Sequence, residues 1–205
     1  MSKVALFASL AVAALGAARA EGSEPEIGLR PGGPTIGAAV LLGGGVESFS
    51  RAGARGVTDT GGFWSARLAW GLRQLVGVEA AYIGSAQTID ALGMSNTAWL
   101  VSNGAEAVAR LNAPVERGQM LFEPYVLGGV GWRLYQVERS AATADVAATD
   151  NVLQVPFGGG FAFGYYSFMV DARFTYRATF FNDLFRTTNT PLDSWSMGAL
   201  VGIQF

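Results

Sequence analysis

The chain of 205 residues contains no histidine and no cysteine, and only 15% of its residues are charged. Without histidine it lacks the imidazole that transfers the proton in Ser-His-acid hydrolysis. Without either residue it has no ligands for a His/Cys zinc site, no disulfide and no reactive thiol. These absences exclude the commonest hydrolytic, zinc and thiol chemistry, and we expect neither a metal site nor a cofactor.

After residue 20 there is no apolar run as long as the roughly 20 residues that a transmembrane helix needs. Lys3 precedes the shorter apolar run 4–15, and Ala18-Arg19-Ala20 matches a small-x-small cleavage site. This pattern is typical of a secretory signal peptide rather than a membrane anchor. We therefore expect residues 1–20 to be a signal peptide for Sec export and residues 21–34, rich in Gly, Pro and charge, to be a periplasmic lead-in.

Charge and composition narrow the classes of protein to which the chain can belong. Removing Lys3 and Arg19 from the 14 basic residues leaves 12 against 16 acidic ones, a net charge of −4. Nucleic-acid binding requires a basic patch, so this balance argues against it. The full chain is nevertheless 50% apolar and has 28 glycines. An all-β chain whose apolar side chains face lipid explains this composition better than a soluble domain does.

The last eleven residues alternate between two faces, which predicts a β-strand. One face carries large apolar side chains: Trp195, Met197, Ala199, Val201, Ile203 and Phe205. The ending resembles the closing strand of bacterial outer-membrane β-barrels, which the barrel-assembly machinery reads through a terminal aromatic signature. The resemblance implies that this machinery is a partner and that an assembly signal is formed by Trp195, Met197, Val201, Ile203 and Phe205.

The same alternation predicts eight strands in all. They lie near 35–49, 62–72, 76–85, 97–111, 121–137, 152–165, 168–180 and 194–205. Short connections (73–75, 112–120 and 166–167) alternate with long polar ones (50–61, 86–96, 138–151 and 181–193). This pattern predicts that residues 35–205 form an eight-stranded antiparallel up-and-down transmembrane β-barrel with both ends in the periplasm.

The size of the side chains indicates which face of each strand lies on the outside of the barrel. Along 168–180, Phe168 and Phe174 lie on one face, and Asp171, Arg173 and Arg177 lie on the other. Across the strands the polar face is mostly small: Gly37, Gly43, Gly45, Ala69, Gly71, Gly129, Gly131, Gly158, Gly160 and Gly164. Small residues suit the crowded inside of an eight-stranded barrel, so the large ones face lipid. A soluble periplasmic ligand-binding barrel with an apolar cavity is the alternative.

Three segments resemble those of the small OmpA-type barrels, the OmpA/OmpX-like family. They are 123–132 (EPYVLGGVGW), 156–161 (PFGGGF) and 171–177 (DARFTYR). The resemblance covers essentially the whole mature chain. It implies a location in the bacterial outer membrane, with membrane lipid and lipopolysaccharide as partners.

Ten charged residues project into the predicted lumen. They are Glu47, Glu79, Glu106, Glu123 and Asp171 with Arg67, Arg110, Arg133, Arg173 and Arg177. Burying them unpaired would be prohibitive, whereas arginine forks pair readily with carboxylates. We therefore expect an Arg–Glu/Asp network that largely closes the lumen, as in the barrels that the chain resembles. A narrow porin-like channel for small ions or solutes, gated by some of these pairs, is the alternative.

Enzymatic interpretations are weak. Glu47, Glu79 and Glu123 are candidate paired carboxylates, but lumenal glutamates that face arginines are usually structural, and we expect no enzyme. The glycine runs 43–45 and 158–160 match no nucleotide-binding spacing and instead indicate close packing.

The long loops are the candidate partner surface. Arg51 and Arg55 suit lipopolysaccharide phosphates. Leu184 and Phe185 are predicted at an exposed apolar tip that either docks a partner or folds back onto the rim. The sequence thus predicts a structural or surface-interaction role, with an unidentified surface ligand at the loops.

Overall fold

The computed structural model describes residues 37–89, 98–138, 148–180, 184 and 191–205. The expected signal peptide and lead-in lie outside these residues. The elements are β1 (Gly37–Phe49), α2 (Ala52–Arg55), β2 (Gly61–Leu72), β3 (Val76–Thr88), β4 (Trp99–Asn112), β5 (Val115–Arg117), β6 (Met120–Glu138), β7 (Thr149–Tyr165), β8 (Phe168–Phe180) and β9 (Ser194–Gln204). In the described part of the chain, no helix has the length and apolarity to cross a membrane.

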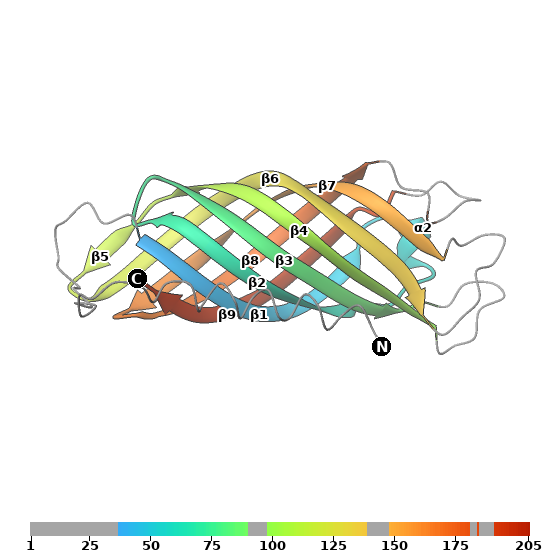
Figure 1. The fold of residues 1–205 in the computed structure, drawn as a ribbon, viewed down its shortest axis with the longest axis horizontal. Coiled ribbons are helices and arrows are strands. Elements are labelled where there is room, and N and C mark those ends of the chain that lie inside the picture. The colour runs from blue at the N-terminus through green and yellow to red at the C-terminus, as the bar shows by residue number, and fades with distance from the viewer. Residues whose placement is uncertain (1–36, 90–97, 139–147, 181–183, 185–190) are drawn as a thin grey trace, which may run out of the picture. The chain divides into compact units, whose positions relative to one another are not determined.

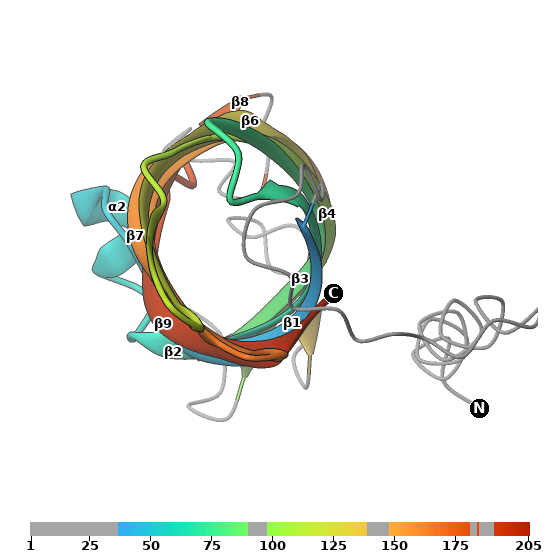
Figure 2. The ribbon, with the colours of Figure 1, turned by 90° about the vertical axis from the view of Figure 1, so that its left-hand side faces the viewer.

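The strands form one closed antiparallel sheet. Their order is β4-β3-β2-β1-β9-β8-β7-β6, and β4 pairs again with β6 and so closes the ring. Figure 1 shows the strands tilted around the barrel, and Figure 2 shows the closed ring from the end at which β5 lies. The predicted eight-stranded up-and-down barrel is confirmed. The sequence missed α2, in the first long loop, and β5, which forms a short hairpin with β6.

Side-chain alternation follows the predicted facing. On β8, Asp171, Arg173 and Arg177 are buried, whereas Phe168 and Phe174 are about half exposed. Over the whole barrel the exposed large apolar side chains have 37–74% of their surface accessible. A soluble cup would turn such side chains inward. The outward apolar face therefore suits a barrel surrounded by lipid and argues against the soluble alternative.

Glycines let the strands approach closely on the inner side of β1. A Cβ added to Gly43 would lie 2.2 Å from the carbonyl oxygen of Ala199, and one added to Gly45 would lie 2.2 Å from that of Met197. Both neighbouring oxygens belong to the β9 backbone, which has little room to move. Close packing therefore accounts for these glycines, as the sequence predicted.

Two groups of buried apolar side chains lie at different levels of the barrel. The apolar cap, at the long-loop end, consists of Phe49, Ala54, Ile89, Ala98, Leu100, Tyr135, Val152, Leu184 and Leu192. The apolar floor lies toward the short turns and consists of Ala39, Leu41, Ala69, Leu72, Val108, Leu121, Tyr125, Leu127, Ala162, Met169 and Leu200.

One loop expectation is wrong. Leu184 is completely buried in the apolar cap and does not form an exposed tip. Burial of an apolar side chain against Phe49 and Leu192 is more favourable than its exposure to water. Of the two outcomes open from the sequence, Leu184 therefore shows the fold-back onto the rim, whereas Phe185 lies outside the described residues.

Candidate functional site

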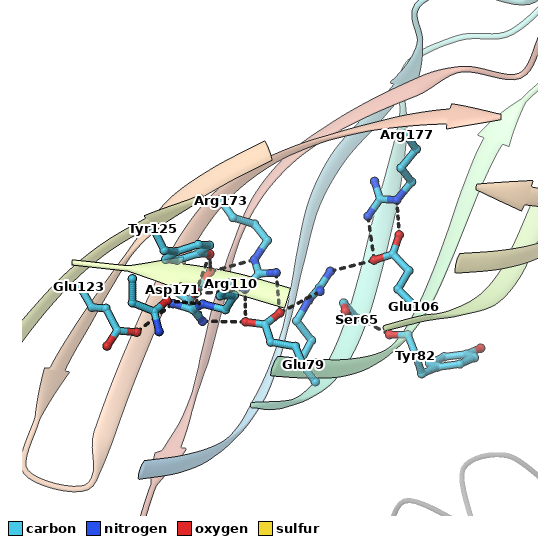
Figure 3. A network of polar contacts seen from close by, with 12 residues as sticks. Ser65, Glu79, Tyr82, Glu106, Arg110, Glu123, Tyr125, Asp171, Arg173 and Arg177 are labelled. Carbon is cyan, nitrogen blue, oxygen red and sulfur yellow. Dashed lines mark hydrogen bonds and ion pairs between the residues drawn. The ribbon is translucent and has the colours of Figure 1, made fainter. Parts of the chain in front are cut away.

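The ten charged residues predicted to face the lumen are all buried, each with at most 4% of its surface exposed. They come from β1, β2, β3, β4, β6 and β8, because each occupies an inward position in the alternation of its strand. Every one of the five acids lies within ion-pair distance of at least one arginine. The ten side chains thereby form one network, most of which is drawn in Figure 3.

Five residues form what we call the short-turn cluster: Glu79, Arg110, Glu123, Asp171 and Arg173. Glu79 is its centre. Arg110 Nη1 donates to Glu79 Oε1 at 2.6 Å, and Arg173 donates to both Glu79 oxygens at 2.9 and 3.0 Å. The Arg173 contact is a two-bond fork, the strongest arrangement for an arginine and a carboxylate. Figure 3 shows the two guanidinium groups converging on Glu79.

The remaining donors of Arg110 are also used. Its Nη2 donates to Glu123 Oε1 at 3.0 Å and its Nε donates to Asn112 Oδ1 at 3.1 Å. Its Cζ lies 3.6 Å from the centre of the Tyr125 ring, a close cation–π contact. Asp171 Oδ2 also lies 3.7 Å from Nη1, so Arg110 is held by three acids, one amide and one aromatic face.

The acids of this cluster are equally well held. Asp171 accepts a hydrogen bond from Tyr125 Oη at 2.8 Å and another from Arg173 Nε at 3.0 Å. Glu123 accepts the backbone N–H of Arg73, in the β2–β3 turn, at 2.7 Å. Within the described chain, no buried side-chain nitrogen or oxygen of the short-turn cluster lacks a hydrogen-bond partner.

Arg67 connects this cluster to a second group. Its Nη1 lies 3.4 Å from Glu79 Oε2, and its Nη2 lies 3.5 Å from Glu106 Oε2. We call the second group, Glu47, Glu106, Arg133 and Arg177, the long-loop cluster. Ion pairs therefore run without interruption from Glu123, which accepts the Arg73 N–H of the turn, towards the apolar cap.

The contacts of the long-loop cluster are fewer. Arg133 Nη1 donates to Glu47 Oε1 at 2.6 Å, while Glu47 Oε2 lies 3.6 Å from Arg177 Nη1. Arg177 Nε donates to Glu106, and its Nη1 donates to Ser196 Oγ at 2.6 Å.

Around this cluster several buried polar atoms have no hydrogen-bond partner among the described residues. They are Glu47 Oε2, Arg67 Nε, both amide atoms of Gln87, Arg133 Nε and Nη2, Gln154 Oε1, Thr175 Oγ1 and Ser194 Oγ.

Sequence reasoning considered only charges and missed the neutral partners. Tyr125 and Tyr135 lie on β6, each two residues from an inward-facing charge, Glu123 or Arg133. Because side chains two residues apart on a strand share a face, the sequence pattern alone predicts that both tyrosines face inward. Gln154 donates to Tyr135 Oη at 3.3 Å, which brings β7 into the network.

The chemistry available to this arrangement is limited. Glu79 and Glu123 share Arg110, whereas Glu47 belongs to the other cluster, so the three acids do not form one carboxylate group. Each is paired with arginine, which favours a structural role. Among the described residues, no three His, Cys, Asp or Glu side chains are grouped as a metal site requires.

At the long-loop end, Asp193 fastens two loops to the barrel. Its carboxylate accepts Arg51 Nε at 2.7 Å and the N–H and hydroxyl of Thr179 at 2.9 and 3.1 Å, and its carbonyl accepts the Ser50 N–H at 2.8 Å. Burial raises the pKa of Asp193, but the hydrogen bonds from Thr179 and Arg51 outweigh burial and lower it overall. Arg51 thus pairs with Asp193 through Nε while 56% of its side chain stays exposed, and Arg55 is exposed as well.

No known protein-family profile matches this sequence, and no curated protein matches it. Solved structures do resemble the fold. One is Ail, the attachment invasion locus protein of Yersinia pestis, solved in complex with the heparin analogue sucrose octasulfate (TM-score 0.51, 14% identity, 83% of this chain and 99% of that chain). Another is the N-terminal β-barrel domain of Pseudomonas aeruginosa OprF (TM-score 0.51, 11% identity, 82% of this chain and 97% of that chain). The predicted likeness to small OmpA-type barrels is therefore confirmed for the fold, and the chain has the architecture of a small outer-membrane β-barrel.

Proposed function

We propose that this chain is a bacterial outer-membrane barrel with a closed lumen, and that it serves as a structural anchor for loops that interact at the cell surface. The observation that carries the proposal is the continuous ion-pair network from Glu123 to Arg133, which lies beneath the apolar cap. An open pore would keep its charged side chains hydrated, whereas these side chains are at most 4% exposed.

The energetics of burial support a closed lumen. Removing one partner of a buried ion pair leaves an uncompensated charge and costs about 3–5 kcal/mol. Opening a water path past Glu79 would separate it from Arg110 and Arg173, which together give it three hydrogen bonds. A path to the outside would also have to cross the apolar cap, where water finds few polar partners.

A narrow channel remains the second candidate, because the long-loop cluster has buried polar atoms without a hydrogen-bond partner among the described residues. Single-channel recording in planar lipid bilayers distinguishes the two. For folded wild-type protein, checked by its shift in gel mobility on boiling, we expect no discrete openings. Arg133→Ala should lower stability and leave the bilayer silent. Reproducible wild-type openings whose ion selectivity changes in Arg133→Ala would establish the channel instead.

The proposed partners follow from the outer surface. Lipid covers the outward apolar face, including Leu42 and Val126. Lipopolysaccharide phosphates are the proposed partners of Arg51 and Arg55 in the first long loop. We further propose that the barrel-assembly machinery reads the outward side chains at the chain end: Trp195, Met197, Val201, Ile203 and Phe205. We also propose that residues 1–20 are a signal peptide for export and that residues 21–34 are a periplasmic lead-in to the barrel.

A further inference from the structure

Arg133 uses its donors unevenly. Its Nη1 contacts Glu47 Oε1 at 2.6 Å and Tyr135 Oη at 3.4 Å. Its Nε and Nη2 have no hydrogen-bond partner among the described residues, although the residue is 0% exposed. These two N–H groups point the same way along one edge of the planar guanidinium and form the fork that binds oxyanions and halides. Buried donors of this kind are almost always satisfied in folded proteins.

The chemistry of the fork itself selects against a cation. At the long-loop level, the guanidinium groups of Arg67, Arg133 and Arg177 lie with the carboxylates of Glu47, Glu106 and Asp150, so the charges there balance. Asp150 lies opposite Tyr135 in the β6–β7 register. The fork of Arg133 offers only donors, and a cation is therefore repelled there.

Other polar groups lie at the same level of the lumen. Gln154 is tied to Arg133 through the Tyr135 hydroxyl, at 3.3 and 3.4 Å. The side chains of Thr175 and Ser194 have hydroxyls without a hydrogen-bond partner in the described part of the chain. Thr175 lies opposite Ser196 and Ser194 lies opposite Arg177 in the β8–β9 register. Among the residues that the structure describes, the short-turn cluster has no comparable free donors. The site is therefore confined to one level of the lumen, beneath the apolar cap.

We propose that the Nε/Nη2 fork of Arg133 binds a small monovalent anion, such as chloride, inside the barrel. The anion completes the hydrogen bonding of Arg133. Neutral acceptors nearby, such as Gln154 Oε1, take water. The anion site does not depend on whether the lumen conducts ions. The bilayer recordings can therefore contradict the closed lumen without affecting the anion site, and the test below can contradict the anion site alone.

Bromide provides the test, because its anomalous scattering distinguishes it from water. The full chain would be refolded and crystallised in bromide, so that the ion is present as the barrel closes. We expect an anomalous peak within hydrogen-bond distance of both Arg133 Nε and Nη2. Water density without an anomalous signal at the fork would overturn the proposal.

Three variants sharpen this result. Arg133→Lys keeps a positive charge opposite Glu47 but has no fork, and should lose the peak. Gln154→Glu preserves side-chain size, adds a negative charge at the same level and should also exclude bromide. Arg55→Lys is a matched exposed control and should keep the peak. A peak that persists in Arg133→Lys would show that other groups hold the halide and would refute the assignment.

Discussion

The two halves of the lumen are built from the same residue types but differ in how completely they are paired. In the short-turn cluster three acids surround two arginines, and Tyr125 and Asn112 take up the donors and faces that remain. In the long-loop cluster two acids face two arginines, and Arg133 keeps two donors without a partner among the described residues. The two clusters differ because neutral side chains in the short-turn cluster complete the hydrogen bonding that its charged groups alone leave unsatisfied.

This difference assigns the two halves different roles. A fully hydrogen-bonded buried network is rigid, and disrupting one member affects all its neighbours. We therefore propose that the short-turn half is the seal of the closed lumen. The long-loop half can rearrange its contacts at lower cost, since Glu47 lies near both Arg133 and Arg177. Substitutions in the two halves should consequently differ in their effect on stability.

The largest effect is expected for Glu79→Gln. The neutral amide cannot balance the three guanidinium groups of Arg67, Arg110 and Arg173, which all lie within 3.4 Å of this carboxylate. We expect the free energy of unfolding to fall by about 4 kcal/mol. Urea unfolding in lipid vesicles measures it, with the half-exposed Glu116→Gln as the control. A loss no larger than that of the control would mean that the short-turn cluster is not the seal.

A smaller loss is expected for Arg133→Met in the long-loop cluster. Methionine fills much of the same volume, removes two donors that lack protein partners and leaves Glu47 near Arg177. We expect a loss of about 2 kcal/mol in the same unfolding assay. Adding Glu47→Leu should recover part of it, because removing both members of a buried pair costs less than removing one. If Arg133→Met proved more damaging than Glu79→Gln, the ranking of the two halves would be reversed.

The sequence predicted the barrel and the facing of its charges because both depend on local alternation. Asp171, Arg173 and Arg177 share one parity on β8, and one strand suffices to see it. The pairing of charges could not be predicted in this way. Arg133 on β6 meets Glu47 on β1, 86 residues away, because the stagger of β1, β6 and the strands between them brings the two to one level. That stagger is a property of the closed ring rather than of any single strand.

The loops show a second limit of local reasoning. Leu184 lies in a polar segment, where an apolar residue suggests a docking tip, yet it is buried with Phe49 and Leu192 in the apolar cap. The cap draws its members from several strand ends and loops, so it exists only after the barrel has formed. The hairpin of β5 was missed for a simpler reason: a three-residue strand is too short to show alternation.

The smallest effect is expected at the mouth of the long-loop half, for Asp193→Asn. The carboxylate holds Arg51 and Thr179, and these hydrogen bonds lower its pKa in the folded state. The unfolded chain has an ordinary Asp pKa of about 3.9. Because the pKa in the folded state is lower, the ionised carboxylate stabilises the fold at any pH above the unfolded pKa. This stabilisation is lost as the pH falls through the pKa of the folded state. At neutral pH we expect Asp193→Asn to cost about 1 kcal/mol, because solvent at the mouth screens part of the interaction.

The pH profile separates this loop contact from the barrel itself. Relative to wild type, Asp193→Asn should be less stable at pH 7, and the difference should shrink below pH 4 as the wild-type carboxylate becomes protonated. Asp59→Asn changes an exposed acid at the same end of the barrel and should alter stability by less than about 0.5 kcal/mol. A stability difference between wild type and Asp193→Asn that stayed constant from pH 7 to pH 3 would show that Asp193 acts through packing alone. The loops at this mouth would then be held by packing rather than by the charge of Asp193.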